Sequence, residues 1–418
     1  MKKVLFLTTR LISPINDGRK VVLYNYCKGL VEQHNCEVRL FSLIDDEERN
    51  IKQPSFISKV YFGKMPSRLE KIKNLLNNSL ILNKWPFQVS LYYSKSTQKK
   101  INNIIKEYKP DIVICDMART AEYFKHLDDK KYNKILDMDD LLSKRYYRQI
   151  ESRTISLNSI GALANKLPKI LQNLIKNPLV MKSIMFKEAK LLSKYEINIS
   201  KYYRSIVFVS PIEAKEFNKK IHKNKSIDIT IGVDYDYFSE KVIKNKKSNY
   251  VVFLGNMNVA HNRDSVNNFL ENIFPHILKE YPNCIFRVVG KCNENYKNIL
   301  KKYKNVEVTG EVDDIRKHVQ DCAVSVAPLL YGTGIKTKIL ETMAMGVSVI
   351  TNDIGNEGIG LENNKQIIIE KNLDKMGIAV LRLLNDVNLQ NKISKEADEY
   401  IKNNHKWNDI LEKFKDVI

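Results

Sequence analysis

Short apolar runs alternate with helix-length segments along almost the whole chain, and this alternation limits the possible folds more than any other feature of the sequence. Runs such as KKVLFLTT and YVVFLGN have the length and apolar content of buried strands, and the segments between them have the length of helices. Such alternation is typical of α/β proteins, because parallel strands need crossover connections. The sequence therefore predicts an α/β fold with parallel sheets, and it predicts ligands beyond the carboxyl ends of the strands.

One long interruption of this alternation divides the chain. Residues 141–204 read as long helices rich in lysine, after which the strand–helix pattern starts again. A chain of 418 residues also exceeds the usual size of a single core. We therefore predict a first domain over 1–204, a second domain over 205–395, and a final helix over 396–418 that crosses back to the first domain.

The charge of the chain is strongly positive, which bears on its partners. Lysine and arginine number 69 against 48 acidic residues, a formal net charge of +21. An excess of this size attracts phosphorylated ligands, anionic membrane surfaces or nucleic acid, although a lysine-rich background accounts for part of it. The basic residues lack the interleaved aromatics of a nucleic-acid-binding sheet, so we predict no nucleic-acid partner.

The cysteines and the apolar run lengths indicate a cytoplasmic protein. The six cysteines form no CxxC pair and lie in apolar surroundings, which fits reduced, buried thiols better than disulfides or a zinc site. The first apolar run breaks at Thr8, too early for a signal peptide. No stretch approaches the ~20 apolar residues of a membrane span.

The stretch LYGTGIKTKILETMAMG, which begins at Leu330, carries the strongest chemical signal. Its glycines follow a predicted strand and precede a helical pattern, so they lie at the start of a helix. Free backbone N–H groups and the helix dipole favour a phosphate there. Lys336 and Lys338 oppose the dipole, which indicates an anionic ligand, and Glu341 is placed to accept hydrogen bonds from ribose hydroxyls. The alternative is a plain glycine turn before a solvated helix face.

Together with other segments, this stretch resembles the signature of the retaining group 1 glycosyltransferases of family 4, GT-B enzymes of bacterial surface polysaccharides. The other segments are IGVDYDYF, VVFLGNMNVAHNRDSVNNFLENIFP, DMDDLLSKRYYR and INDGRK. The resemblance is strongest over 205–360 and weakest over 150–190. It implies a GT-B fold, in which two Rossmann-like domains face a central cleft. It further implies that the C-terminal domain holds the nucleotide sugar, that the N-terminal domain holds the acceptor, and that no metal is needed.

The resemblance assigns roles around the glycine turn. Glu341 matches the second, ribose-binding glutamate of the family's E-x7-E motif, and the first glutamate falls on Thr333. This departure weakens the usual carboxylate contact to the sugar ring. It leaves backbone N–H groups of the turn Gly332–Ile335, near Gly334 and Ile335, to contact the donor.

A second departure lies after the first strand of the predicted C-terminal domain. The family's usual arginine and lysine fall on Asn256 and His261. Neutralising the diphosphate is then the task of Lys336 and Lys338, and His261 is a further donor in its neutral or charged form. The resemblance therefore makes Lys338 and Glu341 the main catalytic candidates of this half.

The N-terminal half offers candidates where predicted strands end. Gly18 and Arg19 open a helix after the first strand, where a diphosphate could approach, but a plain turn explains them as well. Asp116 and Arg119 end a strand that would face the cleft, or they form a structural ion pair. Asp139 and Asp140 follow another strand and bind the acceptor or act as a base, or they cap a helix.

The resemblance implies a retaining, metal-independent glycosyltransferase of the hexosyltransferase type, acting in capsule or O-antigen biosynthesis. It would move a sugar from a nucleoside-diphosphate donor to a growing glycan, linked to polyprenyl or another carrier, with no cofactor besides the donor. The alternative is a catalytically weak GT-B partner subunit that binds or stabilises an active transferase, and Thr333, Asn256 and His261 keep it open. The sequence leaves the oligomeric state undefined.

The basic segment from Asn165 to Arg204 predicts contact with an anionic membrane, peripheral on the inner face of the plasma membrane. It holds nine Lys or Arg against two Glu. Its apolar residues at near-helical spacing are Leu171, Leu174, Ile175, Leu179, Met181, Ile184 and Met185. This composition is typical of an interfacial helix. The alternative packs the apolar face on the N-terminal core and leaves the lysines solvated.

Overall fold

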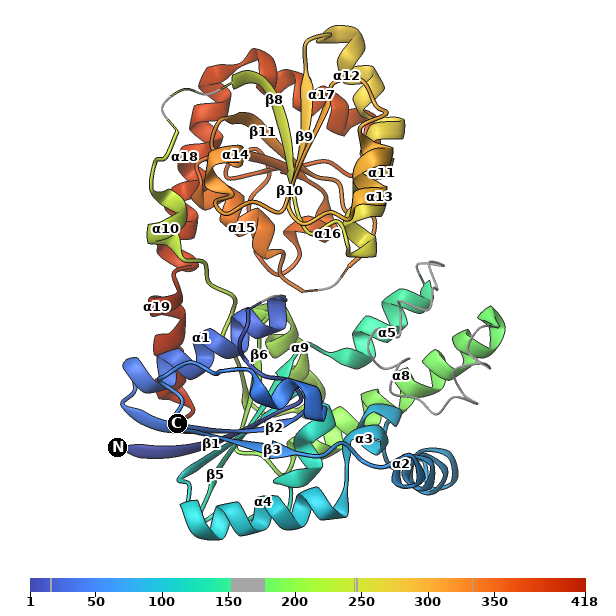
Figure 1. The fold of residues 1–418 in the computed structure, drawn as a ribbon, viewed down its shortest axis with the longest axis vertical. Helices are drawn as coiled ribbons and strands as arrows, with labels where there is room; N and C mark the ends of the chain where they lie inside the picture. Colours follow the sequence, from blue (N-terminus) through green and yellow to red (C-terminus); the bar gives the residue numbers. More distant parts are fainter. Residues whose placement is uncertain (16, 152–176, 244, 246, 333) are drawn as a thin grey trace. The chain divides into compact units, whose positions relative to one another are not determined.

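The computed structural model describes the 418 residues of the chain except residues 16, 152–176, 244, 246 and 333. The described chain forms two compact units (Figure 1). The first unit comprises Met1–Thr230 and Leu411–Ile418, and the second comprises Ile231–Ile410.

The first unit is built on a seven-stranded sheet in the order β3-β2-β1-β4-β5-β6-β7. Its strands are β1 (Lys2–Thr8), β2 (Cys36–Leu43), β3 (Lys59–Gly63), β4 (Ile112–Asp116), β5 (Asn133–Asp139), β6 (Ser205–Phe208) and β7 (Ser226–Asp228). Its α-helices are α1 (Gly18–Glu32), α2 (Arg68–Asn74), α3 (Phe87–Tyr92), α4 (Lys95–Tyr108), α5 (Leu142–Glu151), α8 (Pro178–Ser200) and α9 (Pro211–Ile221). Shorter segments are η1 (Asp46–Asn50), the π-helical η2 (Leu75–Ile81), η3 (Ala118–Tyr123) and η5 (Glu412–Asp416).

The second unit is built on a six-stranded sheet in the order β10-β9-β8-β11-β12-β13. Its strands are β8 (Lys247–Leu254), β9 (Ile285–Val289), β10 (Val306–Gly310), β11 (Cys322–Ala327), β12 (Ser348–Thr351) and β13 (Ile368–Ile369). Its helices are α10 (Tyr235–Ser239), α11 (Ala260–Asn272), α12 (Phe274–Glu280), α13 (Glu294–Leu300), α14 (Arg316–Val319), α15 (Thr337–Ala344), α16 (Asp353–Asn356), α17 (Leu373–Asn385) and α18 (Val387–Asn404). The short α19 (Trp407–Leu411) lies at the boundary of the two units.

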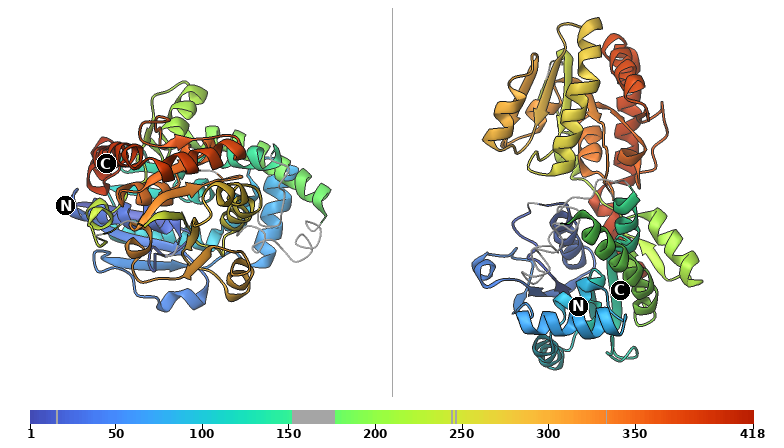
Figure 2. Two further views of the ribbon diagram at one scale, coloured as in Figure 1. Left: turned by 90° about the horizontal axis from the view of Figure 1, so that it is seen from above. Right: turned by 90° about the vertical axis from the view of Figure 1, so that its right-hand side faces the viewer.

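All strand pairs in both sheets are parallel, and helices cover both faces of each sheet (Figures 1 and 2). Parallel strands that are covered on both faces read as continuous apolar runs. Every residue of β4 and of β11 is buried, for example. The predicted α/β fold with two Rossmann-like domains is confirmed.

The boundary between the units lies later in the chain than the sequence predicts. We expected the second domain to begin at residue 205, but β6 and β7 extend the first sheet beside β5. The first unit therefore continues to Thr230. The four residues of β6 and three of β7 resemble any other short apolar strand, and only pairing shows to which sheet they belong.

The C-terminus returns to the first unit, but over a shorter length than the predicted 396–418. Helix α18 stays in the second unit, and only Leu411–Ile418 join the first. There the Phe414 ring meets the Tyr26 ring edge-to-face, with centroids 5.0 Å apart. The Lys413 ammonium lies 2.6 Å from the Asp228 carboxylate. The C-terminal residues are therefore held by aromatic contacts, hydrogen bonds and an ion pair as well as by burial.

The expectations about thiols and membrane spans can be compared directly with the structure. The six cysteines are free, and five of them are buried, which confirms the prediction of reduced thiols. Within the described residues, none of the helices combines the length and the apolar character that crossing a bilayer requires.

Candidate functional site

The strand-to-helix turn predicted around the two glycines is present in the second unit. β11 ends at Ala327, and α15 begins at Thr337 with Lys336 as its N-cap residue. Gly332 and Gly334 have φ angles of +142° and +73°, which residues with a side chain rarely adopt. Both positions therefore require glycine, and the backbone at the start of α15 carries no side chain there. Thr333, the predicted departure from the family motif, lies outside the described residues.

Lys338 is the cation at this helix start that is most strongly affected by its surroundings. Its Nζ donates to Oδ1 of Asn262 at 2.7 Å and lies 4.4 Å from the centroid of the Phe253 ring. Burial, and then the charge of Lys336, lower the pKa of Lys338 to about 7. Removing an ammonium from water disfavours its charged form, and a nearby anion would restore it. The site is thus built to gain from a bound anion.

Lys336 has a different position, because it closes the glycine turn. Its Nζ donates to the backbone carbonyl oxygen of Gly334 at 2.5 Å. Together, Lys336 and Lys338 place two cations at the first turn of α15, where the helix dipole already favours negative charge. The side chain of Ile335, between the turn and the helix, is buried in the core.

Glu341 lies one turn further along α15. Its carboxylate has no hydrogen-bond or ion-pair partner within the described part of the chain, and burial raises its pKa to about 7. The predicted apolar face of the same helix, Ile339, Leu340, Met343 and Ala344, is buried. A packed helix therefore carries a half-buried acceptor that protein groups leave available to a hydroxyl-bearing ligand.

Asn262 is the residue of this site that the sequence interpretation missed. Helix α11 begins at Ala260 without a side-chain cap, so Asn262 lies inside its first turn. Asn262 donates from Nδ2 to the backbone oxygen of Asn256 at 2.9 Å and accepts from Lys338. It joins the segment after β8 to the start of α15, and the adjacency of β8 and β11 makes this possible. Knowledge of this strand order would have indicated the contact between Asn262 and Lys338.

The two departures from the family pattern are also placed by the structure. The side chain of Asn256 accepts a hydrogen bond from the backbone N–H of Asn258 at 2.9 Å. Burial and the charges of Lys338 and Lys336 lower the pKa of His261 to about 4. His261 is therefore neutral at physiological pH. We considered His261 as a donor in its neutral or its charged form, and this pKa favours the neutral form.

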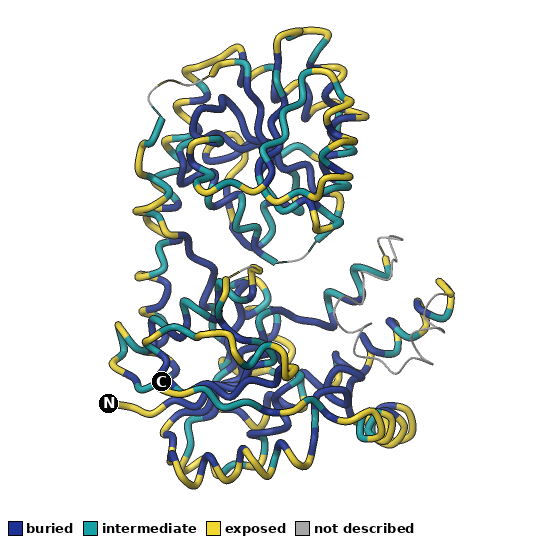
Figure 3. Tube along the Cα trace, in the orientation of Figure 1, coloured by how far each residue is buried: buried dark blue, intermediate teal, exposed yellow. Residues whose placement is uncertain are grey.

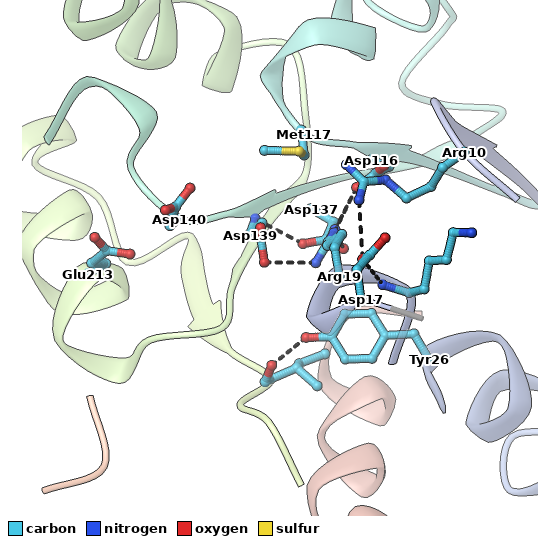
Figure 4. Close-up of polar contacts among 12 residues, drawn as sticks. Arg10, Asp17, Arg19, Tyr26, Asp116, Met117, Asp137, Asp139, Asp140 and Glu213 are labelled. Atoms are coloured by element: carbon cyan, nitrogen blue, oxygen red, sulfur yellow. Dashed lines mark hydrogen bonds and ion pairs between the residues drawn. The ribbon is translucent and has the colours of Figure 1, made fainter. Parts of the chain in front are cut away.

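In the first unit, a buried ion-pair network lies at the carboxyl edge of the sheet (Figure 4). Arg19 donates from Nε and Nη2 to Asp116 at 3.0 and 2.7 Å, from Nη2 to Asp137 at 2.5 Å, and from Nη1 to Asp139 at 3.0 Å. Burial, and then the charges of Asp116 and Asp139, raise the pKa of Asp137 to about 7 although Arg19 lowers it. Asp139, which we expected to bind the acceptor, act as a base or cap a helix, is thus paired with Arg19.

This network bears on the predicted roles of Arg19 and Asp116. Three carboxylates hold the guanidinium, which fits an interior ion pair better than a diphosphate contact. Asp116 does form an ion pair, as its structural alternative expected, but with Arg19 rather than Arg119. Gly18 begins α1, as predicted, and a Cβ there would meet no atom within 4 Å. Ligand roles for these residues stay predictions.

The backbone is strained where β4 and β5 end. Met117 and Asp139 both have φ of +64°, although neither is glycine. Such outliers persist only when the surrounding structure enforces them, and they cluster at functional sites. Arg119 donates to the Met117 sulfur at 2.9 Å. Asp140, which we expected to bind acceptor or cap a helix, accepts hydrogen bonds from Arg145.

Metal-ligand groupings were also sought in the structure. Across residues 1–418 without the gaps stated above, no group of three or more His, Cys, Asp or Glu side chains is arranged to hold a metal ion.

Comparison with known proteins identifies the class to which this arrangement belongs. Residues 248–386 match the family described as "Glycosyl transferases group 1". A protein of Klebsiella pneumoniae described as an "Uncharacterized 44.6 kDa protein in cps region" is 21% identical over 417 residues, which cover 97% of each chain.

Solved structures show the same fold over the whole chain. A sucrose-phosphate synthase from Thermosynechococcus elongatus is 11% identical with a TM-score of 0.64, covering 100% of this chain and 98% of that one. HepE of Anabaena in complex with UDP is 11% identical with a TM-score of 0.65, covering 100% and 99%. TarM of S. aureus, as a mutant in complex with fondaparinux, alpha-GlcNAc-glycerol and UDP, is 13% identical with a TM-score of 0.64, covering 100% and 99%.

Two Rossmann-like units, the second with a basic glycine turn at a helix start, define a GT-B protein. Within this fold class, residues 248–386 match the group 1 glycosyltransferases. The resemblance to the group 1 glycosyltransferases is confirmed over these residues, and the GT-B fold is confirmed over the whole chain.

Proposed function

We propose that the protein transfers a sugar from a nucleoside-diphosphate donor to a growing surface glycan, with retention of anomeric configuration and without a metal. The observation that carries the proposal is that Lys338 and Glu341 lie one turn apart on α15, directly after the glycine turn. Burial disfavours the charged form of Lys338. The Glu341 carboxylate has no hydrogen-bond or ion-pair partner among the described residues. A nucleoside diphosphate offers phosphates for the first and ribose hydroxyls for the second.

The chemistry we propose relies mainly on stabilising the departing nucleoside diphosphate. As the sugar–phosphate bond weakens, negative charge grows on the diphosphate. Lys336, Lys338 and the backbone N–H groups around Gly334 would stabilise it in a site that is already arranged to receive it. The acceptor hydroxyl attacks from the same face and passes its proton to the donor phosphate, so the two lysines take the place that a metal ion fills in other transferases. Positioning of the two substrates supplies the rest of the acceleration.

Two findings support a surface glycan as the acceptor. The relative in a cps region covers nearly the whole chain, and a similar structure, TarM, is described in complex with a glycosylated glycerol. We propose that the acceptor is carried on a membrane lipid such as a polyprenyl phosphate, and that the protein works on the cytoplasmic face of the plasma membrane as a peripheral protein. The donor base and sugar are to be found by screening.

A catalytically weak partner subunit is the second candidate, and the pKa of His261 favours it. A neutral histidine and Asn256 stand where the resemblance leads us to expect two cations, so the site carries less positive charge than the family pattern. Such a protein would bind an active transferase and turn over no donor by itself.

Donor binding and turnover separate these candidates. The purified protein is screened by thermal shift against nucleoside diphosphates and their sugars, and donors that bind are then tested for release of nucleoside diphosphate. A transferase binds at least one donor and hydrolyses or transfers it, whereas a Glu341→Ala variant binds it weakly. Absence of turnover with every donor supports the partner subunit, and absence of binding to every nucleotide refutes the transferase proposal.

A further inference from the structure

The helix formed by α2 and η2 has its polar and apolar faces exchanged relative to an ordinary surface helix. Its buried residues are Leu75 and Ser79, and Ser79 shares a hydrogen bond with the hydroxyl of Ser90 at 2.7 Å. Asn74 donates to the backbone oxygens of Ser90 and Tyr93 at 3.1 and 2.9 Å. The side of the helix that faces the protein is thus held largely by polar contacts.

The outward side of the same helix is apolar. The exposed apolar residues of this segment are Leu69, Ile72, Leu76, Leu80, Ile81 and Leu82. Positions 69, 72, 76 and 80 recur at helical spacing and form one stripe, about 16 Å long at the rise of an α-helix. Figure 3 shows the exposed residues of this helix in yellow at the margin of the first unit. Soluble proteins rarely leave such a continuous apolar stripe uncovered.

The first turns of α8 extend this stripe. Leu179 and Phe186 are exposed, and a groove of about 390 Å³ lies between the two elements. The residues that line it are Leu80, Phe87, Leu179, Val180, Ser183, Ile184 and Lys187. We call the exposed apolar residues of α2, η2 and α8, with this groove, the apolar platform.

The charges around the apolar platform are of one sign. From residue 49 to residue 106 the sequence has twelve Lys or Arg and a single acid, Glu70. The carboxylate of Glu70 is already bound to the backbone N–H of Ser67 and to the hydroxyl of Ser94, each at 2.9 Å. The first acid of α8, Glu188, is buried and accepts from the backbone N–H groups of Phe87 and Gln88 at 2.6 and 3.1 Å. Both acids therefore accept hydrogen bonds from protein groups, and Glu188 is also buried.

The cations remain at the surface. Arg68, Lys73, Lys84 and Lys182 are exposed, and none forms an ion pair with any residue that the structure describes. An anionic bilayer complements both parts of this pattern. Its acyl chains accept the leucines at a depth of about 5–10 Å, and its phosphates neutralise the cations.

We infer that the apolar platform is a membrane-docking surface, which inserts its leucines into an anionic phospholipid bilayer while α2, η2 and the start of α8 lie in the plane of the interface. This inference rests on the proposed function for its purpose, namely to reach a lipid-linked acceptor. It overlaps the sequence prediction, which assigned membrane contact to residues 165–204, at Leu179 and Ile184 of α8, and it adds α2 and η2. Of the apolar residues named in that prediction, Met181 and Met185 are buried in the core, as its alternative expected. Leu171, Leu174, Ile175, Lys169 and Lys176 lie outside the described residues.

The test measures sedimentation of the full-length protein with vesicles of phosphatidylcholine alone, or of phosphatidylcholine and phosphatidylglycerol in equal parts. The apolar variant combines Leu76→Gln, Leu80→Gln and Ile81→Gln. Its matched control combines Ile299→Gln, Ile378→Gln and Val387→Gln, three residues of the second unit that are 49–64% exposed, against 44–70% for the platform residues. We expect the platform variant to lose about tenfold or more in partitioning to the mixed vesicles. The control is expected to match the wild type.

A charge variant tests the other half of the pattern. This variant combines Lys73→Glu, Lys84→Glu and Lys182→Glu. It is expected to bind mixed vesicles about tenfold or more weakly, since each cation near anionic lipid contributes to the binding free energy. The control set Lys279→Glu, Lys302→Glu and Lys392→Glu changes the net charge equally in the second unit and is expected to have a smaller effect. Salt is expected to release the wild type.

The outcomes distinguish this inference from the proposed function. Equal binding of wild type and apolar variant overturns the inference, even if the enzyme transfers sugar. An apolar variant that changes the oligomeric state in light scattering, with unchanged vesicle binding, shows instead that a second copy covers the platform. Vesicle binding that depends on the platform in a protein without donor turnover supports the inference and refutes the transferase proposal. Retention of the melting temperature in both variants confirms that folding is intact.

Discussion

Raising the pH is expected to weaken donor binding, and Lys338 is the reason. Burial, and then the charge of Lys336, lower the pKa of Lys338 to about 7 in the free protein. A diphosphate beside the ammonium favours the charged form, so its pKa rises again on binding. Protein in which Lys338 is neutral must take up a proton to bind well. The apparent dissociation constant is therefore divided by the charged fraction of Lys338.

The size of the effect follows from that pKa. Roughly nine-tenths of Lys338 is charged one pH unit below its pKa, and roughly one-tenth is charged one unit above it. Between about pH 6 and pH 8 the dissociation constant should thus rise about tenfold. An ordinary exposed lysine stays charged over this whole range and would give no change.

Isothermal titration calorimetry with the best donor from the screen measures this profile. A nucleoside-diphosphate sugar keeps the same charge across the range, so the protein alone titrates. Lys338→Arg stays charged and is expected to show a much flatter profile, whereas Lys338→Met is expected to bind weakly at every pH. Glu341 has a pKa of about 7 as well, but it is present in both wild type and Lys338→Arg, so the comparison isolates the lysine. An arginine variant with a profile as steep as the wild type would refute this reasoning.

Three further predictions follow from the two units. Glu341→Ala, measured by release of nucleoside diphosphate, is expected to lower transfer by roughly 30-fold to 1000-fold while the melting temperature is retained, the loss typical of one charge-assisted contact in a dry site; activity within threefold of wild type contradicts the ribose role. Transfer is expected to be unchanged by EDTA, and a loss that manganese restores would show that a metal takes part. Arg19→Ala is expected to lower the free energy of unfolding in urea by about 3–5 kcal/mol, since it leaves buried aspartates unpaired, whereas Lys20→Ala on the same helix is expected to cost little. An Arg19→Ala variant of full stability that fails to bind donor would instead support the ligand role predicted for Arg19.

Some parts of the candidate site could be read directly from neighbouring residues. The glycine turn, the helix start at Thr337 and the buried face of α15 all follow from patterns within about 20 residues, because backbone conformation and helical periodicity are local properties. For the same reason Asp116 was correctly placed at the end of a buried strand, and Gly18 at the start of a helix.

Other parts depended on which strands are neighbours. Asn262 reaches Lys338 only because β8 and β11 pair, although the two residues are 76 positions apart. Arg19 meets Asp137, 118 positions away, because α1 follows β1 and the sheet places β4 and then β5 beside it. Sequence patterns indicated that charged residues end these strands but could not show which charges meet, and so could not distinguish a ligand contact from an ion pair.

The sequence by itself determined the α/β class, the run of strands and helices, the glycine turn and the family resemblance, because each depends on the order of residues along a short stretch. Only the tertiary structure decided that β6 and β7 complete the first sheet, that Arg19 is held by three aspartates, and that Lys338 is buried enough to lose its proton near neutral pH. It also decided that Leu76 and Leu80 face outward while Ser79 faces the protein. A leucine reads the same in a core as on a surface, and burial is a property of the packing around it.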